Sequence, residues 1–251
     1  MTSNAPNRQD KNVGNYGDIL KHAALVQLAH YLASCPRTLS YYYIDTHTYL
    51  HHAKLANLDW FKQISWLEHR YPQYVRYRNA EQSWLDRGEY LCSVGLVTQL
   101  CPHAVFYCYE HRPDTQTRLR LQLDAAKLKS ESVGGQFNAD VWLNGVRHQL
   151  SQQSLVLMLV DPFQMTNEQV SLTERFLSKL EQTKSQYICV LFDYQQAERV
   201  KWNLHTRLNA DCMTIDFQPF HLACVFSATL SDAVVRELTP LGWKIHEPRP
   251  Q

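Results

Sequence analysis

The sequence predicts an α/β protein with a mostly parallel, doubly wound sheet. β-rich runs alternate with helical stretches along the chain, and this alternation is typical of a parallel sheet with helices on both faces. The apolar run Leu155–Asp161 is the clearest buried strand. The last two expected strands are separated only by Gln218–His221. A parallel pair needs a crossover of about a dozen residues, so these two strands should form an antiparallel hairpin.

The expected elements follow one another in a regular order. The first helix carries Leu20, Ala24, Leu28 and Tyr31 on one face, and Asp18 is its candidate N-cap. The expected helices are Asp18–Ala33, Leu58–Tyr71, Ser93–Cys101, Asp114–Leu128, Leu143–Gln149, Asn167–Glu181, Gln195–Leu208 and Asp232–Leu241. The expected strands are Tyr41–Asp45 (YYYID), Ala104–Glu110 (AVFYCYE), a weak one at Gln136–Asp140, Leu155–Asp161, Tyr187–Phe192, Met213–Phe217 and Leu222–Phe226.

Composition indicates a folded globular protein. The chain has 251 residues, of which 45% are hydrophobic and 20% are charged. We expect one domain over residues 1–251. Lys and Arg total 25 and Asp and Glu total 24, so the net charge of +1 argues against a chain that is basic throughout. The N-terminus shows no signal-peptide core, and Leu155–Val160 is far shorter than the about 20 residues of a membrane span.

The seven cysteines indicate a compartment. Their number is odd, no pair has C-x-x-C spacing, and Cys108, Cys189 and Cys224 lie inside apolar runs. This pattern is typical of reduced, buried thiols rather than of a disulfide framework. The sequence therefore predicts a cytoplasmic protein.

Acidic residues follow four of the expected parallel strands. Asp45 and Glu110 end the first two strands, and Asp140 and Asp161 end the next two. Ligands bind beyond the carboxyl ends of such strands, so these side chains are expected at one rim. A single acid there is more often a helix cap, but four in register favour a ligand site. For an adenosine ligand, Glu110 would accept hydrogen bonds from both ribose hydroxyls and Asp140 from the adenine amino group.

Asp161 and Pro162 are the candidate catalytic pair. The amino groups of adenine and cytosine are weak nucleophiles because their lone pair is delocalised into the ring. A carboxylate and a neighbouring backbone carbonyl that accept the two N–H bonds would localise that pair and aim it at a sulfonium methyl group. Proline fixes φ and helps to present the carbonyl.

Several segments, in chain order, resemble the motifs of one family of enzymes. Gly14–His22 (GNYGDILKH) resembles the family's G-N-x-A-D-V-L-K-H, and Tyr43–His47 (YIDTH) resembles its Y-L-D-T-H. Tyr90–Ser93 resembles Y-P-G-S, Glu110 matches the acid of E-L-H-P, Asp140 matches the Asp of D-G-F, and Leu157–Pro162 resembles L-I-L-I-D-P. The resemblance runs from about residue 8 to residue 165, with weaker similarity beyond.

These motifs are those of the RlmJ family, bacterial enzymes that methylate an adenine amino group in large-subunit ribosomal RNA. The resemblance implies a Rossmann-like class I methyltransferase fold, with a small helical insertion at residues 50–92 after the first strand, and a site for S-adenosylmethionine. The implied cofactor contacts are His22, His47, Ser93, Glu110, Asp140 and Asp161, with His47 and Ser93 at the methionine part. Lys21 would reach toward the substrate. Plain structural roles stay open for three of these residues: a polar helix position for His22, a loop histidine for His47 and a solvated helix face for Lys21.

The sequence departs from the family at three places. After D-T-H the family has A-G-A-G, whereas this chain has Thr48–His52 (TYLHH), and the loss of glycine should reshape the methionine pocket. The family's D-P-P-Y reads Asp161–Gln164 (DPFQ), which leaves Phe163 as the candidate stacking residue. The family's Y-R-H-S-F-H reads Asn7–Asn12 (NRQDKN), where only Arg8 remains as a candidate substrate contact. Loss on the substrate side favours a substrate other than ribosomal adenine.

Two competing interpretations concern other clusters. His47, His51 and His52 with Asp45 offer an alternative metal site, because residues 47 and 51 are one helical turn apart. The aromatic and basic segment Trp60–Arg78 offers a stacking surface for a nucleic-acid strand. Packing is favoured for that segment, since the apolar positions at helical spacing are Trp60, Ile64, Leu67 and Tyr71.

The leading hypothesis is a cytoplasmic S-adenosylmethionine-dependent transferase. It would methylate, or otherwise displace at the sulfonium carbon, a small or modified substrate. One alternative is RNA adenine N-methylation with a rearranged target pocket, and another is a non-catalytic binding protein on the same fold. Hydrolase, P-loop and dehydrogenase hypotheses lack support because their motifs are absent.

Overall fold

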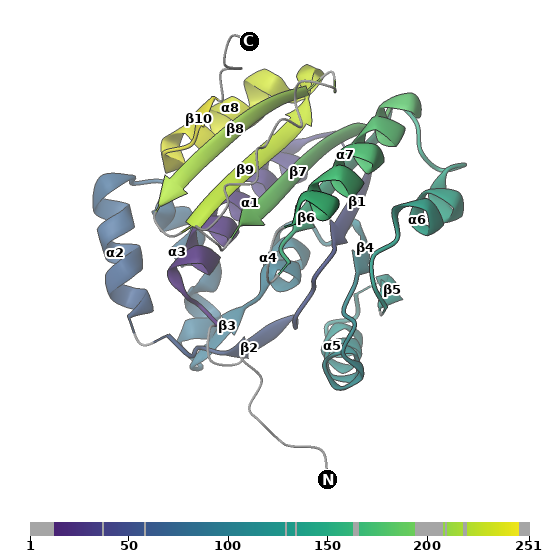
Figure 1. The fold of residues 1–251 in the computed structure, drawn as a ribbon. Helices are drawn as coiled ribbons and strands as arrows, with labels where there is room; N and C mark the ends of the chain where they lie inside the picture. The colour runs from purple at the N-terminus through teal and green to yellow at the C-terminus, as the bar shows by residue number, and fades with distance from the viewer. Residues whose placement is uncertain are drawn as a thin grey trace.

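A mostly parallel sheet forms the centre of the computed structural model, which describes residues 13–36, 38–57, 59–128, 130–133, 135–162, 166–193, 208, 210–217 and 220–245 (Figure 1). Its strands are β1 (Ser40–Asp45), β4 (Val105–Cys108), β5 (Ser130–Val133), β6 (Ser154–Val160), β7 (Gln186–Asp193), β8 (Ala210–Phe217), β9 (Phe220–Ser227) and β10 (Lys244–Ile245). The eight strands lie in the order β10-β8-β9-β7-β6-β1-β4-β5. Strands β5, β4, β1, β6 and β7 are parallel, and the remaining pairings are antiparallel.

The predicted C-terminal hairpin is confirmed. β8 and β9 pair in antiparallel fashion from Ala210 and Ser227 to Phe217 and Phe220. Five parallel strands with the central β1 flanked by β4 and β6, followed by this hairpin, are the topology of class I methyltransferases. β10 adds a short strand at the edge beside β8.

Helices cover both faces of the sheet (Figure 1). The helices are α1 (Tyr16–Ser34), α2 (Trp60–Arg70), α3 (Tyr74–Leu85), α4 (Ser93–Leu100), α5 (Pro113–Ala125), α6 (Ala139–Val146), α7 (Asn167–Gln182) and α8 (Ser231–Leu238), with short 3-10 turns at Ala228–Leu230 and Thr239–Leu241. Side chains of β6 alternate between two cores: Leu157 and Leu159 join the one with α1, α4 and α8, whereas Val156 and Met158 join the one with α6 and α7. The apolar run of β6 therefore buries both faces, as its sequence predicts.

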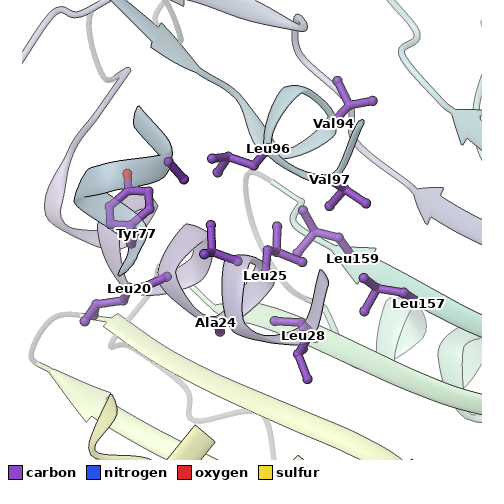
Figure 2. Close-up of a cluster of buried hydrophobic side chains, with 14 of the residues drawn as sticks. Leu20, Ala24, Leu25, Leu28, Tyr77, Val94, Leu96, Val97, Leu157 and Leu159 are labelled. Carbon is purple, nitrogen blue, oxygen red and sulfur yellow. The ribbon is translucent and has the colours of Figure 1, made fainter. Parts of the chain in front are cut away.

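α1 is buried along nearly its whole length. The predicted face is buried at Leu20, Ala24 and Leu28, and Leu25 on another face is buried too. Figure 2 shows these α1 side chains together with those of α4 and β6. This helix is central rather than peripheral, and it brings its first two turns to the carboxyl edge of the sheet.

The predicted cap of α1 is wrong by three residues. The helix begins at Tyr16, and the side chain of Asn15 accepts the Asp18 N–H at 2.9 Å. Asp18 in turn accepts the N–H of Gly14 at 3.0 Å. Asn15 is therefore the N-cap, and the Asp18 carboxylate satisfies the N–H of Gly14, the residue before it.

The strand expected at Gln136–Asp140 is also wrong. β5 ends earlier, at Val133, and α6 begins at Ala139. The Asn138 side chain accepts the N–H groups of Asp140 and Val141 at 3.0 and 3.1 Å, because a short amide reaches the free donors of a first helical turn. Asp140 thus lies on a helix and not at the end of a strand.

Residues 52–91, which lie between β1 and α4, form an inserted layer. β2 (His52–Lys54) and β3 (Glu89–Leu91) pair as a two-stranded antiparallel sheet, with α2 and α3 between them. α2 agrees with the sequence, whereas α3 was not predicted. Trp60, Ile64 and Leu67 are buried, so the packing interpretation of this segment is confirmed.

The expected helix at Gln195–Leu208 lies outside the described residues, apart from Leu208. All seven cysteines are unpaired. None of the helices in the described ranges is both long enough and apolar enough to cross a membrane.

Candidate functional site

A pocket lies at the carboxyl edge of the sheet, where β1 and β6 end beside the first turns of α1. It encloses about 130 Å³. Its lining residues are Val13, Asn15, Asp18, Lys21, His22, His47, Tyr49, Tyr90, Cys92, Ser93, Asp161, Pro162 and Phe192. The structure therefore brings together six of the predicted site residues, which are Lys21, His22, His47, Ser93, Asp161 and Pro162.

Lys21 forms ion pairs with two carboxylates that line this pocket. Its Nζ donates to Asp18 Oδ1 at 3.0 Å and to Asp161 Oδ2, and it lies 5.4 Å from the ring centroid of Phe192. Burial alone would lower the pKa of the Lys21 ammonium, but the two carboxylates outweigh burial and raise it. Lys21 is therefore a lasting cation at neutral pH that fixes Asp161 in place, and it is not a base.

The first turn of α1 places Asp18 where it can hold Lys21. Residues three apart on a helix share a face, so the carboxylate and the ammonium meet directly. Burial raises the pKa of Asp18, but Lys21, His22 and the Gly14 N–H outweigh it and bring the pKa below its ordinary value. The sequence prediction missed Asp18 as a site residue, although its spacing from Lys21 carried the signal.

His22 connects the pocket to the inserted layer. Its Nδ1 lies 2.8 Å from the hydroxyl of Tyr90, which lies 2.5 Å from the hydroxyl of Tyr77. Burial and the Lys21 charge lower the pKa of His22 to about 3. His22 is therefore a neutral hydrogen-bonding group at physiological pH. Tyr90 was also missed, because a tyrosine in an apolar run gives no signal of a polar contact.

Asp45 faces inward and organises the end of β1. Its Oδ2 accepts from Ser93 Oγ at 2.5 Å and from the Tyr43 hydroxyl at 3.3 Å, and its Oδ1 accepts from the His47 N–H at 3.2 Å. Burial raises the pKa of Asp45 to about 6. Ser93 therefore ties α4 to β1 while it lines the pocket.

His47 lines the pocket, near the carboxylates of Asp161 and Glu110. Its Nδ1 is 2.7 Å from Thr46 Oγ1. Burial lowers the pKa of His47, while the carboxylates of Asp161 and Glu110 oppose this effect. His47 is thus neutral near pH 7, and it is close enough to both carboxylates to respond to their charge.

Glu110 and Asp140 do not line the pocket. Glu110 follows β4 by two residues, and its buried carboxylate pairs with Arg112. Asp140 lies on the first turn of α6, where its side chain is 70% exposed and pairs with Lys179 of α7. Because β5 ends before the predicted strand, the chain carries Asp140 away from the β1–β6 edge.

Tyr49 lines the pocket at a position where the A-G-A-G motif has glycine. Its hydroxyl oxygen is buried and has no hydrogen-bond partner among the described residues. A buried hydroxyl without a partner costs about 1–3 kcal/mol. A polar ligand atom beside Tyr49 would remove this cost.

The remaining predicted residues fall into two groups. Arg8 and Phe163 lie outside the described residues. The histidines of the alternative metal site are divided, because His47 lines the pocket whereas His51 lies 3.2 Å from Thr98 Oγ1 of α4. Within the described part of the chain, no three His, Cys, Asp or Glu side chains are grouped as metal ligands.

The sequence matches no family model and no curated protein sequence. The fold is similar to the crystal structure of the protein LPL1258 from Legionella pneumophila str. Philadelphia 1, of the DUF519 family. That match has a TM-score of 0.67 and 14% identity, and it covers 94% of this chain and 98% of that chain. At this identity the likeness supports the fold alone.

Two weaker likenesses are to methyltransferases. The METTL16 methyltransferase domain matches with a TM-score of 0.42 and 8% identity, over 80% of this chain and 79% of that chain. An rRNA methylase from Streptococcus thermophilus matches with a TM-score of 0.42 and 9% identity, over 80% and 94%. Likeness at this level carries no argument about activity. The strand order defines the fold as class I methyltransferase-like.

Proposed function

We propose that this protein binds S-adenosylmethionine in the pocket and transfers its methyl group to a nitrogen or oxygen of a small or modified molecule. The observation that carries the proposal is the position of the Asp161 carboxylate. It follows β6 at the carboxyl edge, precedes Pro162 and is held by the buried Lys21. Ligands of open parallel sheets bind at this edge.

The pocket fits the cofactor better at one end than at the other. His47, Ser93 and the unpaired Tyr49 hydroxyl offer polar contacts for the methionine part. The nucleoside part has less room, since the pocket of about 130 Å³ is below the about 300 Å³ at the small end of ligand pockets. As they stand, the pocket residues can therefore accommodate the methionine part of the cofactor and the methyl group to be transferred. Side chains near Glu110 must move before the nucleoside part can bind.

Asp161 acts on the nucleophile in this proposal. When bound, the cofactor supplies a methyl group on a sulfonium centre. Oδ2 of Asp161 is occupied by Lys21, whereas Oδ1 receives no hydrogen bond from the described residues. Oδ1 can therefore accept the N–H or O–H of the acceptor and orient its lone pair. As the bond from the acceptor to the methyl group formed, the methyl–sulfur bond would break and S-adenosylhomocysteine would leave. The acceptor's proton would pass to the Asp161 carboxylate, because Lys21 is already protonated.

Calorimetric titration with S-adenosylmethionine and S-adenosylhomocysteine tests the proposal. We expect saturable binding of both ligands below 1 mM, because polar groups of the pocket converge on one volume. Absence of heat and of any shift in melting temperature at several millimolar ligand would leave the non-catalytic binding protein as the better hypothesis.

Tyr49→Phe is expected to have opposite effects on stability and on binding. Removing a buried hydroxyl that has no partner should raise the free energy of unfolding of the free protein by about 1 kcal/mol. The same change should weaken S-adenosylhomocysteine binding by about five- to tenfold, the equivalent of one hydrogen bond. Urea unfolding and calorimetry measure the two effects.

Tyr187→Phe provides the matched control. The Tyr187 hydroxyl donates to Glu181 at 2.8 Å, away from the pocket. This variant should lose stability and keep its ligand affinity. If Tyr49→Phe behaved in the same way as Tyr187→Phe, the Tyr49 hydroxyl would have no role in binding.

The other assignments stay predictions. The ribose contact of Glu110 and the adenine contact of Asp140 follow from the resemblance to the RNA methyltransferases, and alanine variants in the same titrations test them. We also propose a single domain over residues 1–251, with residues 50–92 inserted, in the cytoplasm where the thiols stay reduced. For the RNA alternative, affinity should fall steeply with salt.

A further inference from the structure

We infer that Arg112 is a specificity-determining residue that competes with a ligand's ribose for Glu110. This inference rests on the proposed nucleoside cofactor site. The guanidinium and a ribose diol need the same two carboxylate oxygens, so each excludes the other. Arg112 thereby sets how tightly the protein holds nucleoside ligands.

Both oxygens of the Glu110 carboxylate already accept hydrogen bonds from Arg112. Oε1 accepts from the backbone N–H of Arg112 at 2.8 Å and from Arg112 Nε at 3.0 Å, and Oε2 accepts from Arg112 Nη2 at 2.6 Å. His111 Nδ1 also lies 3.4 Å from Oε1. Such a two-pronged, charge-assisted pair is about twice as strong as neutral hydrogen bonds, so a neutral diol displaces it only at a cost. The carboxylate predicted to bind ribose is therefore already occupied.

The backbone holds Arg112 in this position. Arg112 precedes Pro113, the first residue of α5, and has the extended conformation (φ −86°, ψ 119°) that proline imposes on the residue before it. The Gln116 side chain donates to the Glu110 carbonyl at 2.5 Å and fixes the start of the turn. The short loop thus returns the guanidinium onto the carboxylate two residues before it.

Tyr49 connects this pair to the pocket. The Arg112 guanidinium carbon lies 5.6 Å from the centroid of the Tyr49 ring, and Tyr49 lines the pocket. The ring therefore supports the guanidinium from the pocket side. Outward movement of Arg112 would free the two Glu110 oxygens and release the Tyr49 ring, which is the enlargement that a nucleoside needs.

Arg112→Gln is expected to tighten S-adenosylhomocysteine binding at least tenfold in calorimetry. Arg112→Lys keeps the positive charge but loses the two-pronged contact with the carboxylate, so it should give a smaller gain in affinity. The gain should depend on the ribose diol. The wild type should bind a 2′-deoxyribose analogue nearly as tightly as S-adenosylhomocysteine. Arg112→Gln should bind the analogue clearly more weakly than it binds S-adenosylhomocysteine. A purely structural role of Arg112 would not create this discrimination.

Arg87→Gln is the matched control. Arg87 also pairs with the carboxylate two residues away, Glu89, at 3.8 Å, and its guanidinium lies 4.1 Å from the centroid of the Trp84 ring, but it lies outside the pocket. Its replacement should leave ligand affinity unchanged. Wild-type binding that is unchanged or weakened in Arg112→Gln would overturn the inference and leave the proposed function intact. No binding by the wild type or by any variant would overturn both.

Discussion

Replacing Lys21 with methionine is expected to lower the free energy of unfolding by about 2–4 kcal/mol at neutral pH. Removing one partner of a fully buried ion pair costs about 3–5 kcal/mol. We expect a somewhat smaller loss here, because both carboxylates are partly exposed. Methionine fills a similar volume but leaves Asp18 and Asp161 facing each other without a cation. Urea unfolding at pH 7.5 measures the loss.

The loss should shrink in acid. In the wild type the pKa of Asp18 is lowered, so its contribution to stability is present above the ordinary aspartate pKa and is lost as pH falls through the lowered value. Without Lys21 the same carboxylate is destabilised when ionised and recovers on protonation. The recovery of the variant narrows the difference in stability near pH 4, and the loss in the wild type narrows it further below the ordinary aspartate pKa. A difference that stayed constant with pH would assign the loss to packing instead.

Lys62→Met is the matched control for this experiment. Lys62 pairs with Asp59 at 3.0 Å with the same spacing of three residues, but its side chain is 84% exposed. Exposed pairs of this kind contribute well under 1 kcal/mol. Equal effects of Lys62→Met and Lys21→Met would contradict the importance of burial at Lys21.

Gly95→Ala is expected to destabilise the protein by about 3 kcal/mol. A Cβ at Gly95 would lie 2.2 Å from the His51 carbonyl oxygen and 2.7 Å from Leu91 Cδ2. The carbonyl cannot yield easily, because it accepts the Cys92 N–H at 3.0 Å. Overpacking against backbone forces α4 away from the inserted sheet, at a cost of about 1–3 kcal/mol or more. Thermal and urea unfolding should both report the loss.

Gly145→Ala should have the opposite sign. Gly145 also lies in an eight-residue helix, in the last turn of α6, but a Cβ there meets no atom within 4 Å. Alanine loses less backbone entropy than glycine in a helix, so this change should stabilise by about 0.5–1 kcal/mol. If both variants were stabilised, the close approach of α4 to the His51 carbonyl would be wrong.

The pocket could be predicted only in part. Six of its residues were predicted. Asp161 and Pro162 follow an apolar strand, whereas Lys21, His22, His47 and Ser93 lie in segments that resemble motifs of the RlmJ family. Asp18 was overlooked although its partner Lys21 lies only three residues away. Tyr90 and Tyr49 did not stand out, since Tyr90 gains its role from His22, 68 residues away in the chain, and Tyr49 from the lack of a partner among the described residues. Glu110 and Asp140 were predicted as cofactor contacts, but their ion pairs with Arg112 and Lys179 were not predicted.

The sequence by itself determined two features of the sheet, the doubly buried strand β6 and the C-terminal hairpin. A long apolar run such as β6 has no polar face to expose, so it must be buried on both sides, and the short link between β8 and β9 permits only a hairpin. These are local properties of composition and chain length. Only the tertiary structure decided which charges meet: Lys21 and Asp161 are 140 residues apart and touch because α1 crosses the carboxyl end of β6. Arg112 pairs with Glu110 because the turn before Pro113 places the guanidinium next to the carboxylate. The periodicity of the sequence does not predict this contact.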